Sequence, residues 1–236
     1  MNQEFTLKGL APILLLFASL GAAAQPSEIE AEYRVTNSGI TIGSIKESFV
    51  RKGDKYSIQS VTRSEGVLKA FLDDQITVES VGRVGADGLQ PLEYDEHRLK
   101  DAKRDLKSTF DWDKGVMRTV LHGKNTETPL PSATQDRISV MYQFVNMRKF
   151  TDTLVLPISE RRKIAIHTYR LVGEEKIATP LGEFDTRHYQ RVVDNPTDTR
   201  ADVWLAKDRF NFPVRAIFDD PKGFRLEQAV VSLNAH

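Results

Sequence analysis

The feature that most constrains the fold is an alternation of apolar and polar residues that starts at Ile29 and runs almost to the end of the chain. Turn residues interrupt it about every ten residues, as in an antiparallel sheet or barrel. Asn37-Ser38-Gly39 and Lys52-Gly53-Asp54 are such turns, because these residue types tolerate the positive φ of tight hairpins. The candidate strands are Ile29–Thr36, Ile40–Val50, Tyr56–Arg63, Gln75–Val84, Gln90–Arg98, Arg104–Asp111, Val116–His122, Lys163–Val172, Phe184–Val193, Arg200–Leu205, Val214–Asp219 and Arg225–Leu233.

This number of strands does not fit a flat sheet, because strand twist accumulates across a sheet of about twelve strands. The predicted fold is therefore mainly β, with a single antiparallel, strongly curled sheet or incomplete β-barrel. We expect neighbouring strands to pair as a meander. The chain contains no internal repeat or low-complexity linker, so residues 25–236 are expected to form a single β-rich domain.

One stretch, PLPSATQDRISVMYQF at residues 129–144, interrupts the strands. Ser132 and Gln135 have the spacing of a capping box, and Asp136 suits the positive end of a helix dipole. We interpret these residues and Arg137 as the structural start of a helix, with Arg137 paired to a strand carboxylate. An apolar stripe follows, opposite Gln143 and Asn146, at Ile138, Met141, Tyr142 and Val145. The pattern predicts one helix over about 133–148, packed in or across the concave side of the sheet.

A second break in the alternation lies between the third and fourth candidate strands. Val67, Leu68, Phe71 and Leu72 are spaced to share one helical face. They predict a short helix near 65–72, placed where it could act as a lid.

The first 24 residues have the order expected of a secretory signal peptide. Lys8 precedes an apolar run from Leu10 to Leu20, and small residues ending at Ala24 supply a cleavage site. The run is well short of the ~20 residues that span a bilayer, and later segments are too polar for a span. We expect export, cleavage after Ala24 and a soluble periplasmic product with no integral membrane segment.

Composition excludes several classes of protein. The chain has no cysteine, which removes disulfides, thiolate metal sites and a cysteine nucleophile. Lys plus Arg number 33 and Asp plus Glu also number 33, so no global field attracts nucleic acid. The histidines are isolated, whereas zinc needs three or four convergent ligands, so we expect no metal site and no cofactor.

No catalytic signature occurs, and no catalytic residue is predicted. The chain lacks a nucleophile elbow, a phosphate-binding glycine loop and a dinucleotide fingerprint. Glu93, Asp95 and Asp136 would be the acid and base of a hydrolase for envelope glycans, which needs two carboxyl groups about 5–10 Å apart. Solvated charges on a hairpin edge, which discourage edge-to-edge aggregation, are the simpler explanation of Glu93 and Asp95.

The aromatic residues favour an apolar interior, which either packs completely or leaves a cavity for a ligand. If a cavity exists, the predicted helix and the late strand with Trp204 should wall it. The candidate ligand-binding residues are Phe71, Ile138, Met141, Tyr142, Val145 and Trp204.

The succession of short motifs resembles a proteobacterial family of exported proteins, the domain of unknown function DUF3108. The motifs include Ser64 to Phe71 (SEGVLKAF), Gln135 to Ser139 (QDRIS) and Thr179 to Gly182 (TPLG). Trp204 to Asp208 and Pro213-Val214-Arg215 are also similar to strands of the periplasmic lipoprotein carrier and its outer-membrane receptor. That resemblance implies a half-open antiparallel barrel with helices over its mouth, and it implies no activity.

Three functional hypotheses remain open from the sequence. The first is a periplasmic, non-enzymatic binding protein that holds a lipid, acyl chain or apolar peptide inside the curled sheet. The second is an envelope assembly factor with a packed interior, whose partner is another envelope protein bound by strand addition. The third is the glycan hydrolase.

Overall fold

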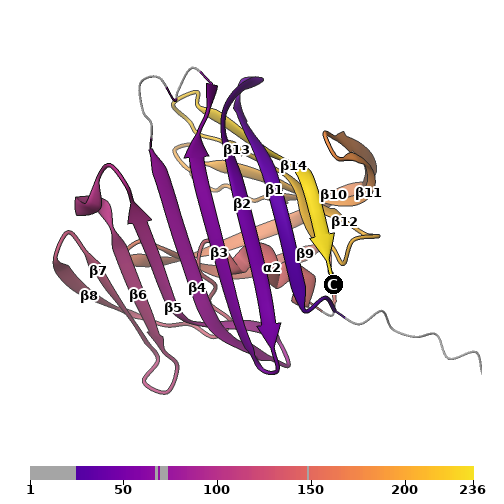
Figure 1. Cartoon of the computed structure of the whole chain (residues 1–236). Coiled ribbons are helices and arrows are strands. Elements are labelled where there is room, and N and C mark those ends of the chain that lie inside the picture. Colours follow the sequence, from indigo (N-terminus) through magenta and orange to yellow (C-terminus); the bar gives the residue numbers. More distant parts are fainter. Residues whose placement is uncertain (1–24, 67–68, 70–73, 148) are drawn as a thin grey trace, which may run out of the picture.

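The computed structural model describes residues 25–66, 69, 74–147 and 149–236 (Figure 1). Fourteen strands pair antiparallel in one sheet that does not close, in the order β8-β7-β6-β5-β4-β3-β2-β1-β14-β13-β12-β11-β10-β9. Their bounds are β1 Glu28–Asn37, β2 Ile40–Lys52, β3 Lys55–Ser64, β4 Gln75–Gly85, β5 Gly88–Arg98, β6 Leu106–Asp111, β7 Val116–Leu121, β8 Lys124–Pro129, β9 Thr153–Glu160, β10 Lys163–Thr179, β11 Gly182–Arg191, β12 Arg200–Ala206, β13 Phe212–Asp219 and β14 Arg225–Ala235. The prediction of an antiparallel, unclosed, mainly β fold is confirmed.

The sheet curls back on itself around the helix α2 (Ser139–Asn146). Figure 1 shows β1–β4 in front, β9 and β10 behind, and α2 between these two walls. We call the concave side of the sheet the inner face and its opposite the outer face. The first and last strands pair with each other, with Ile29 opposite Ala235, so the two free edges are β8 and β9 in the middle of the sequence.

Two strands, β8 and β9, were not predicted, and both are edges of the sheet. β8 has the sequence KNTETP and buries none of its residues, so it lacks the alternation that marks a strand with one buried face. β9 reads TLVLPISE, an apolar run with Pro157 inside it. Proline donates no ladder hydrogen bond and is therefore favoured on edge strands or at bulges, and Pro157 lies on an edge strand.

The helix α2 is shorter than the predicted span of 133–148. Gln135 is still extended, because its N–H donates to the Pro157 carbonyl at 2.8 Å and its carbonyl accepts from the Ser159 N–H at 2.8 Å. The helix therefore cannot begin before this pairing ends, and the capping box at Ser132 was wrong. Asp136 caps the helix instead: Ser139 N donates to Asp136 Oδ1 at 2.8 Å, and Asp136 N donates to Ser139 Oγ at 2.9 Å.

The helix is buried around most of its circumference. Tyr142 has 0% exposure and stacks on Phe49, with ring centroids 5.2 Å apart. On the opposite side, Val140 and Phe144 pack in a second core cluster whose other buried members are Leu154, Leu156, Ile158, Tyr189, Val203 and Leu205. A sheet that surrounds the helix leaves it no solvated side, which is why the expected outward face at Gln143 and Asn146 is also buried.

Gln143 fixes the helix to the β4–β5 turn. Its Nε2 donates to the Asp87 carbonyl at 2.8 Å, and its Oε1 accepts from the Leu89 N–H at 2.7 Å. Gly88 lies between these two residues with φ +106°, and a Cβ there would collide with the Gln143 amide. Glycine is required here by both the backbone conformation and the close approach.

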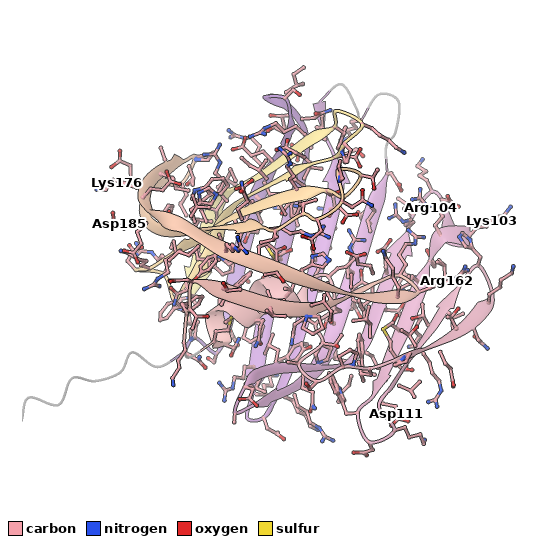
Figure 2. The ribbon with its side chains drawn as sticks, turned by 180° about the vertical axis from the view of Figure 1, so that it is seen from behind. Lys103, Arg104, Asp111, Arg162, Lys176 and Asp185 are labelled. Atoms are coloured by element: carbon pink, nitrogen blue, oxygen red, sulfur yellow. The ribbon has the colours of Figure 1, made fainter. Side chains whose placement is uncertain are left out.

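Side chains bridge the gap between the two edges of the sheet. Arg162, at the turn between β9 and β10, donates from Nη2 to the Leu121 carbonyl at 2.9 Å. Thr128 of β8 donates from Oγ1 to the Arg162 carbonyl at 3.0 Å. Figure 2 shows Arg162 at this end of the β9–β10 hairpin. The barrel is thus completed by isolated contacts rather than by a continuous ladder.

The far end of the β10–β11 hairpin, marked by Lys176 and Asp185 in Figure 2, extends beyond the rest of the sheet. Leu181 at its tip donates from N to the Val230 carbonyl of β14 at 3.3 Å. Ala178 and Pro180 line a small pocket with Arg215 and Ala229, which lie on the outer face. The hairpin therefore covers part of the outer face of β12–β14.

The predicted signal peptide at 1–24 lies outside the described residues, and so does most of the predicted helix near 65–72. Among the described helices, none has the length and apolarity that a membrane crossing requires.

Candidate functional site

A cavity of about 670 Å³ lies inside the curled sheet, beside α2. Its size falls within the range of about 300–1,000 Å³ found for small-molecule sites. Every strand from β1 to β5 and from β9 to β14 contributes lining residues, together with the segment at 137–144. The apolar part of the lining includes Ile45, Ile76, Val78, Ile138, Val140, Met141, Phe144, Val203, Phe218 and Leu226.

One polar group in the lining is centred on Glu96 of β5, which is 3% exposed. Arg98 donates to Glu96 Oε1 from Nε at 2.9 Å and from Nη2 at 2.7 Å. Arg137 donates from Nη1 to Oε2 at 3.1 Å, and the Tyr94 hydroxyl donates to the same oxygen at 3.1 Å. Two guanidinium groups and a phenol thus satisfy one buried carboxylate, as buried charges require.

A second polar group joins β9 to β10. His167, which is 7% exposed, hydrogen-bonds through Nε2 to Glu160 Oε1 at 2.7 Å, and Lys163 lies 3.3 Å from Glu160 Oε2. The hydrogen bond with His167 is the main reason why the pKa of Glu160 falls to about 2. In the described part of the chain, no three acidic or histidine side chains converge as a metal site would require.

Glu47 of β2 is the third polar group, and it differs from the others in having no cation beside it among the described residues. Ser60 Oγ and Tyr142 Oη donate to its carboxyl oxygens at 3.1 and 3.2 Å. Burial raises the pKa of Glu47 above its usual range, and the two hydrogen bonds oppose this only in part. Its remaining exposure is toward the cavity.

The predicted ligand-binding residues divide between the cavity and its surroundings. Ile138 and Met141 line the cavity. Tyr142 and Val145 belong to the core cluster against β1, β2 and β13 and do not reach the lining. Phe71 lies outside the described residues.

Trp204 is on the outer face, so the sequence assigned it to the wrong side of its strand. Its indole N–H donates to Glu175 Oε1 at 2.8 Å, its ring stacks on His188 at 4.2 Å, and the Arg215 guanidinium lies 5.1 Å from the ring. Val203, the preceding residue, lines the cavity. The β10–β11 hairpin buries the outer face here. The prediction assumed that a tryptophan in this strand would face the interior of the barrel, but Trp204 is buried between the strand and this hairpin.

The residues assigned to the helix start have separate positions. Ser132 is exposed in a turn, whereas Gln135 is buried and donates from Nε2 to the Leu89 carbonyl at 2.8 Å. Asp136 is fully buried and also accepts from Ser80 Oγ at 2.5 Å. Burial raises the pKa of Asp136, and its hydrogen bonds oppose that rise. Arg137 lines the cavity and pairs with Glu96.

The carboxylates considered for a hydrolase do not meet in a groove. Asp95 points away from the cavity, toward His97 at 3.3 Å and Lys107 at 3.4 Å. Glu93 also pairs with Lys107, at 3.2 Å, while Asp136 has 0% exposure under the helix. These three residues therefore supply no acid and base pair around a substrate.

Sequence reasoning missed the polar residues of the cavity itself, among them Glu47, Glu96, Glu160, His167 and Arg191. A signal for them was present in the alternation. Glu47 stands between Ile45 and Phe49 in the inward-facing phase of β2, where an apolar residue is the rule. A charged residue in the inward phase of a strand predicts a buried polar network or a ligand site.

The fold and this cavity define a class of protein, an incomplete antiparallel β-barrel that encloses a helix and a partly apolar chamber. A family model described as a protein of unknown function, DUF3108, matches residues 32–229, and the chain belongs to that family. The resemblance seen in the motifs is thus confirmed. No curated protein matches the chain.

The solved structures that align with this chain share little sequence with it. A β-barrel-like protein of the domain of unknown function DUF1849 from Brucella abortus aligns with a TM-score of 0.55 and 12% identity, over 91% of this chain and 100% of its own. A protein described as a lipoprotein from Parabacteroides distasonis gives 0.40 and 10%, over 89% and 96%. A domain described as an outer membrane lipoprotein-sorting protein from Vibrio parahaemolyticus gives 0.31 and 10%, over 91% and 87%.

Proposed function

We propose that this protein is a periplasmic, non-enzymatic binding protein that holds the apolar part of a lipid-like ligand in the cavity between α2 and the inner face of the sheet. The observation that carries the proposal is the cavity of about 670 Å³, with its apolar walls at Met141, Val203 and Phe218. An interior filled by its own side chains would instead favour the assembly factor.

The energetics of apolar burial support a chain-like ligand. Each buried methylene contributes about 0.8 kcal/mol, so ten of them supply about 8 kcal/mol. Association costs an estimated 4–15 kcal/mol, so apolar burial alone gives weak binding. The ligand of a useful carrier must also satisfy polar groups, and the cavity lining contains several.

The sequence supports the periplasmic location. The first 24 residues have the charge, apolar run and small residues of a cleavable signal, with cleavage proposed after Ala24. The lack of cysteine leaves no residue for acylation at that site, so we propose a soluble mature protein over residues 25–236 rather than an anchored one.

Native mass spectrometry of protein purified from the periplasm tests the proposal. We expect an added mass in the range of a lipid, which organic extraction removes. Ala216 is a small residue of the cavity wall, so Ala216→Trp should fill the cavity and abolish the added mass.

The matched control is Ser57→Trp, which puts the same ring on an exposed position of β3 whose neighbours Tyr56 and Ile58 are buried. This variant should keep the added mass. An absence of added mass in the wild type, together with no uptake of added fatty acid or alcohol, would refute the proposal.

A further inference from the structure

Tyr169 and Arg191 form a cross-strand pair inside the barrel. They are directly opposite in the register of β10 and β11, and both line the cavity. Arg191 donates from Nη1 to the Thr199 carbonyl at 3.0 Å. Among the described residues, no carboxylate lies within ion-pair distance of Arg191, and the Tyr169 hydroxyl has no hydrogen-bond partner.

The other basic side chains of the cavity differ from Arg191 in this respect. Arg98 and Arg137 share Glu96, and His167 is held by Glu160. Arg161 also lines the cavity without an acid partner among the described residues, but it lies in the β9–β10 turn, eight residues before Tyr169 along the chain. Arg191 is thus a cation in a partly apolar chamber whose charge the described residues do not balance.

The environment of the pair favours a donor role toward an anion. Burial raises the pKa of Tyr169 to about 12, and the nearby charge of Arg191 opposes the rise. The phenol therefore keeps its proton at neutral pH and can donate beside the guanidinium. Hydrogen bonds in which one partner is charged are stronger than neutral ones and hold planar oxyanions well.

An apolar part of the cavity wall begins next to Arg191 and Tyr169. Gln190 pairs with Asp202, so Arg191 neighbours Ala201 one position further along the two strands. Ala201 is opposite Phe218 on β13, and both line the cavity with Val203. The polar pair at Arg191 thus adjoins apolar lining of the same cavity, which also includes Met141.

We propose that the ligand is an amphiphile with one anionic head group, a carboxylate or phosphate, which Arg191 and Tyr169 bind while its apolar chain lies along Ala201 and Val203. This inference rests on the function proposed above. The anion supplies the counter-charge that Arg191 lacks, and the chain fills the apolar part of the cavity.

Calorimetric titration of delipidated protein with three single-chain probes tests the proposal. Palmitate and hexadecyl phosphate carry the two candidate head groups, and hexadecanol carries the same chain without charge. Arg191→Gln should weaken binding of the preferred anion about 10–100-fold, as expected for loss of a charged hydrogen bond. Tyr169→Phe should weaken it several-fold, and both variants should bind hexadecanol as the wild type does.

The matched control is Arg170→Gln, which removes the same charge from the neighbouring, exposed position of β10. It should leave all three affinities unchanged. If Arg191→Gln does not fold, as judged by circular dichroism, Tyr169→Phe carries the test.

The outcomes separate the two proposals. Equal wild-type affinity for hexadecanol and both anions, unaffected by either variant, would overturn the head-group site while the hydrophobic carrier stands. Loss of anion binding in Arg161→Gln but not in Arg191→Gln would overturn the assignment to Arg191. Failure of all three probes to bind would overturn the carrier function as well.

Discussion

Replacing Asp136 with alanine should destabilise the start of α2, the helix that lines one side of the cavity. Asp136 Oδ1 accepts from the backbone N–H groups of Ile138 at 3.0 Å and Ser139 at 2.8 Å, while Oδ2 accepts from Ser80 Oγ. All of these groups are buried, so water does not replace the lost acceptor.

The magnitude follows from these contacts. Loss of a helix cap costs about 0.5–2 kcal/mol. A buried donor left without a partner costs about 1–3 kcal/mol, and Asp136→Ala leaves at least the Ser80 hydroxyl in that state. Burial of the Asp136 carboxylate is itself unfavourable, as its raised pKa indicates, so removing it offsets part of the loss. We expect Asp136→Ala to lower the free energy of unfolding by about 1.5–4 kcal/mol.

Urea unfolding followed by circular dichroism measures this difference, provided that the denaturant slope is unchanged. Asp136→Asn keeps one acceptor oxygen for the helix start, so it should cost less than alanine. Ser80→Ala removes one of the three hydrogen bonds and should cost about 1 kcal/mol. A cost below about 1 kcal/mol for Asp136→Ala would refute the idea that this carboxyl group fixes the helix.

Three further predictions concern the helix and the cavity. Met141→Asp puts a charge where both core clusters meet, so it should lower the free energy of unfolding by about 2–5 kcal/mol or abolish the ligand mass. Met141→Leu should preserve both stability and ligand mass. Unchanged melting with unchanged ligand content would contradict this prediction. Because the folded state raises the pKa of Glu47, the wild type should lose stability as pH rises from about 4.5, and Glu47→Gln should not. The variant should therefore gain stability relative to the wild type over this pH range. A difference in urea unfolding that does not change with pH would rule this out. Gly88→Ala should lower the free energy of unfolding by at least about 2 kcal/mol, because of the positive φ and the collision with Gln143. Gly85→Ala in the same hairpin has room for a Cβ and should cost less stability. Equal melting temperatures of the two variants would argue against the clash.

Alternation and turn residues were sufficient to predict the interior strands. Each predicted strand has a counterpart in the structure, and buried and exposed residues alternate along strands such as β1 and β3. The alternation is missing from β8, which has no buried residue, and from β9, whose apolar run contains Pro157, so neither strand was predicted. It also ended β10 at Val172, whereas the strand continues to Thr179 after a register shift near Leu171.

Helical periodicity predicted the candidate site only in part. It grouped Ile138 and Met141, which line the cavity, with Tyr142 and Val145, which do not. Which face of β12 points inward depends on the hairpin that covers Trp204, and a local pattern does not contain that tertiary contact. The pairing of Arg191 with Tyr169 likewise depends on strand register, which a single sequence leaves undetermined.

The pairing of the first strand with the last has a consequence for how this molecule could be rebuilt. Ser27 and Glu28 donate from N to the His236 carbonyl at 2.6 and 3.0 Å, so the ends of the described chain are neighbours. A circular permutant that joins them and opens the backbone after Pro129 would place both new termini at the end of the edge strand β8. Its most sequence-distant ladder would become a local hairpin, and because folding rate rises as contacts become local, the rearranged chain should fold faster to the same sheet.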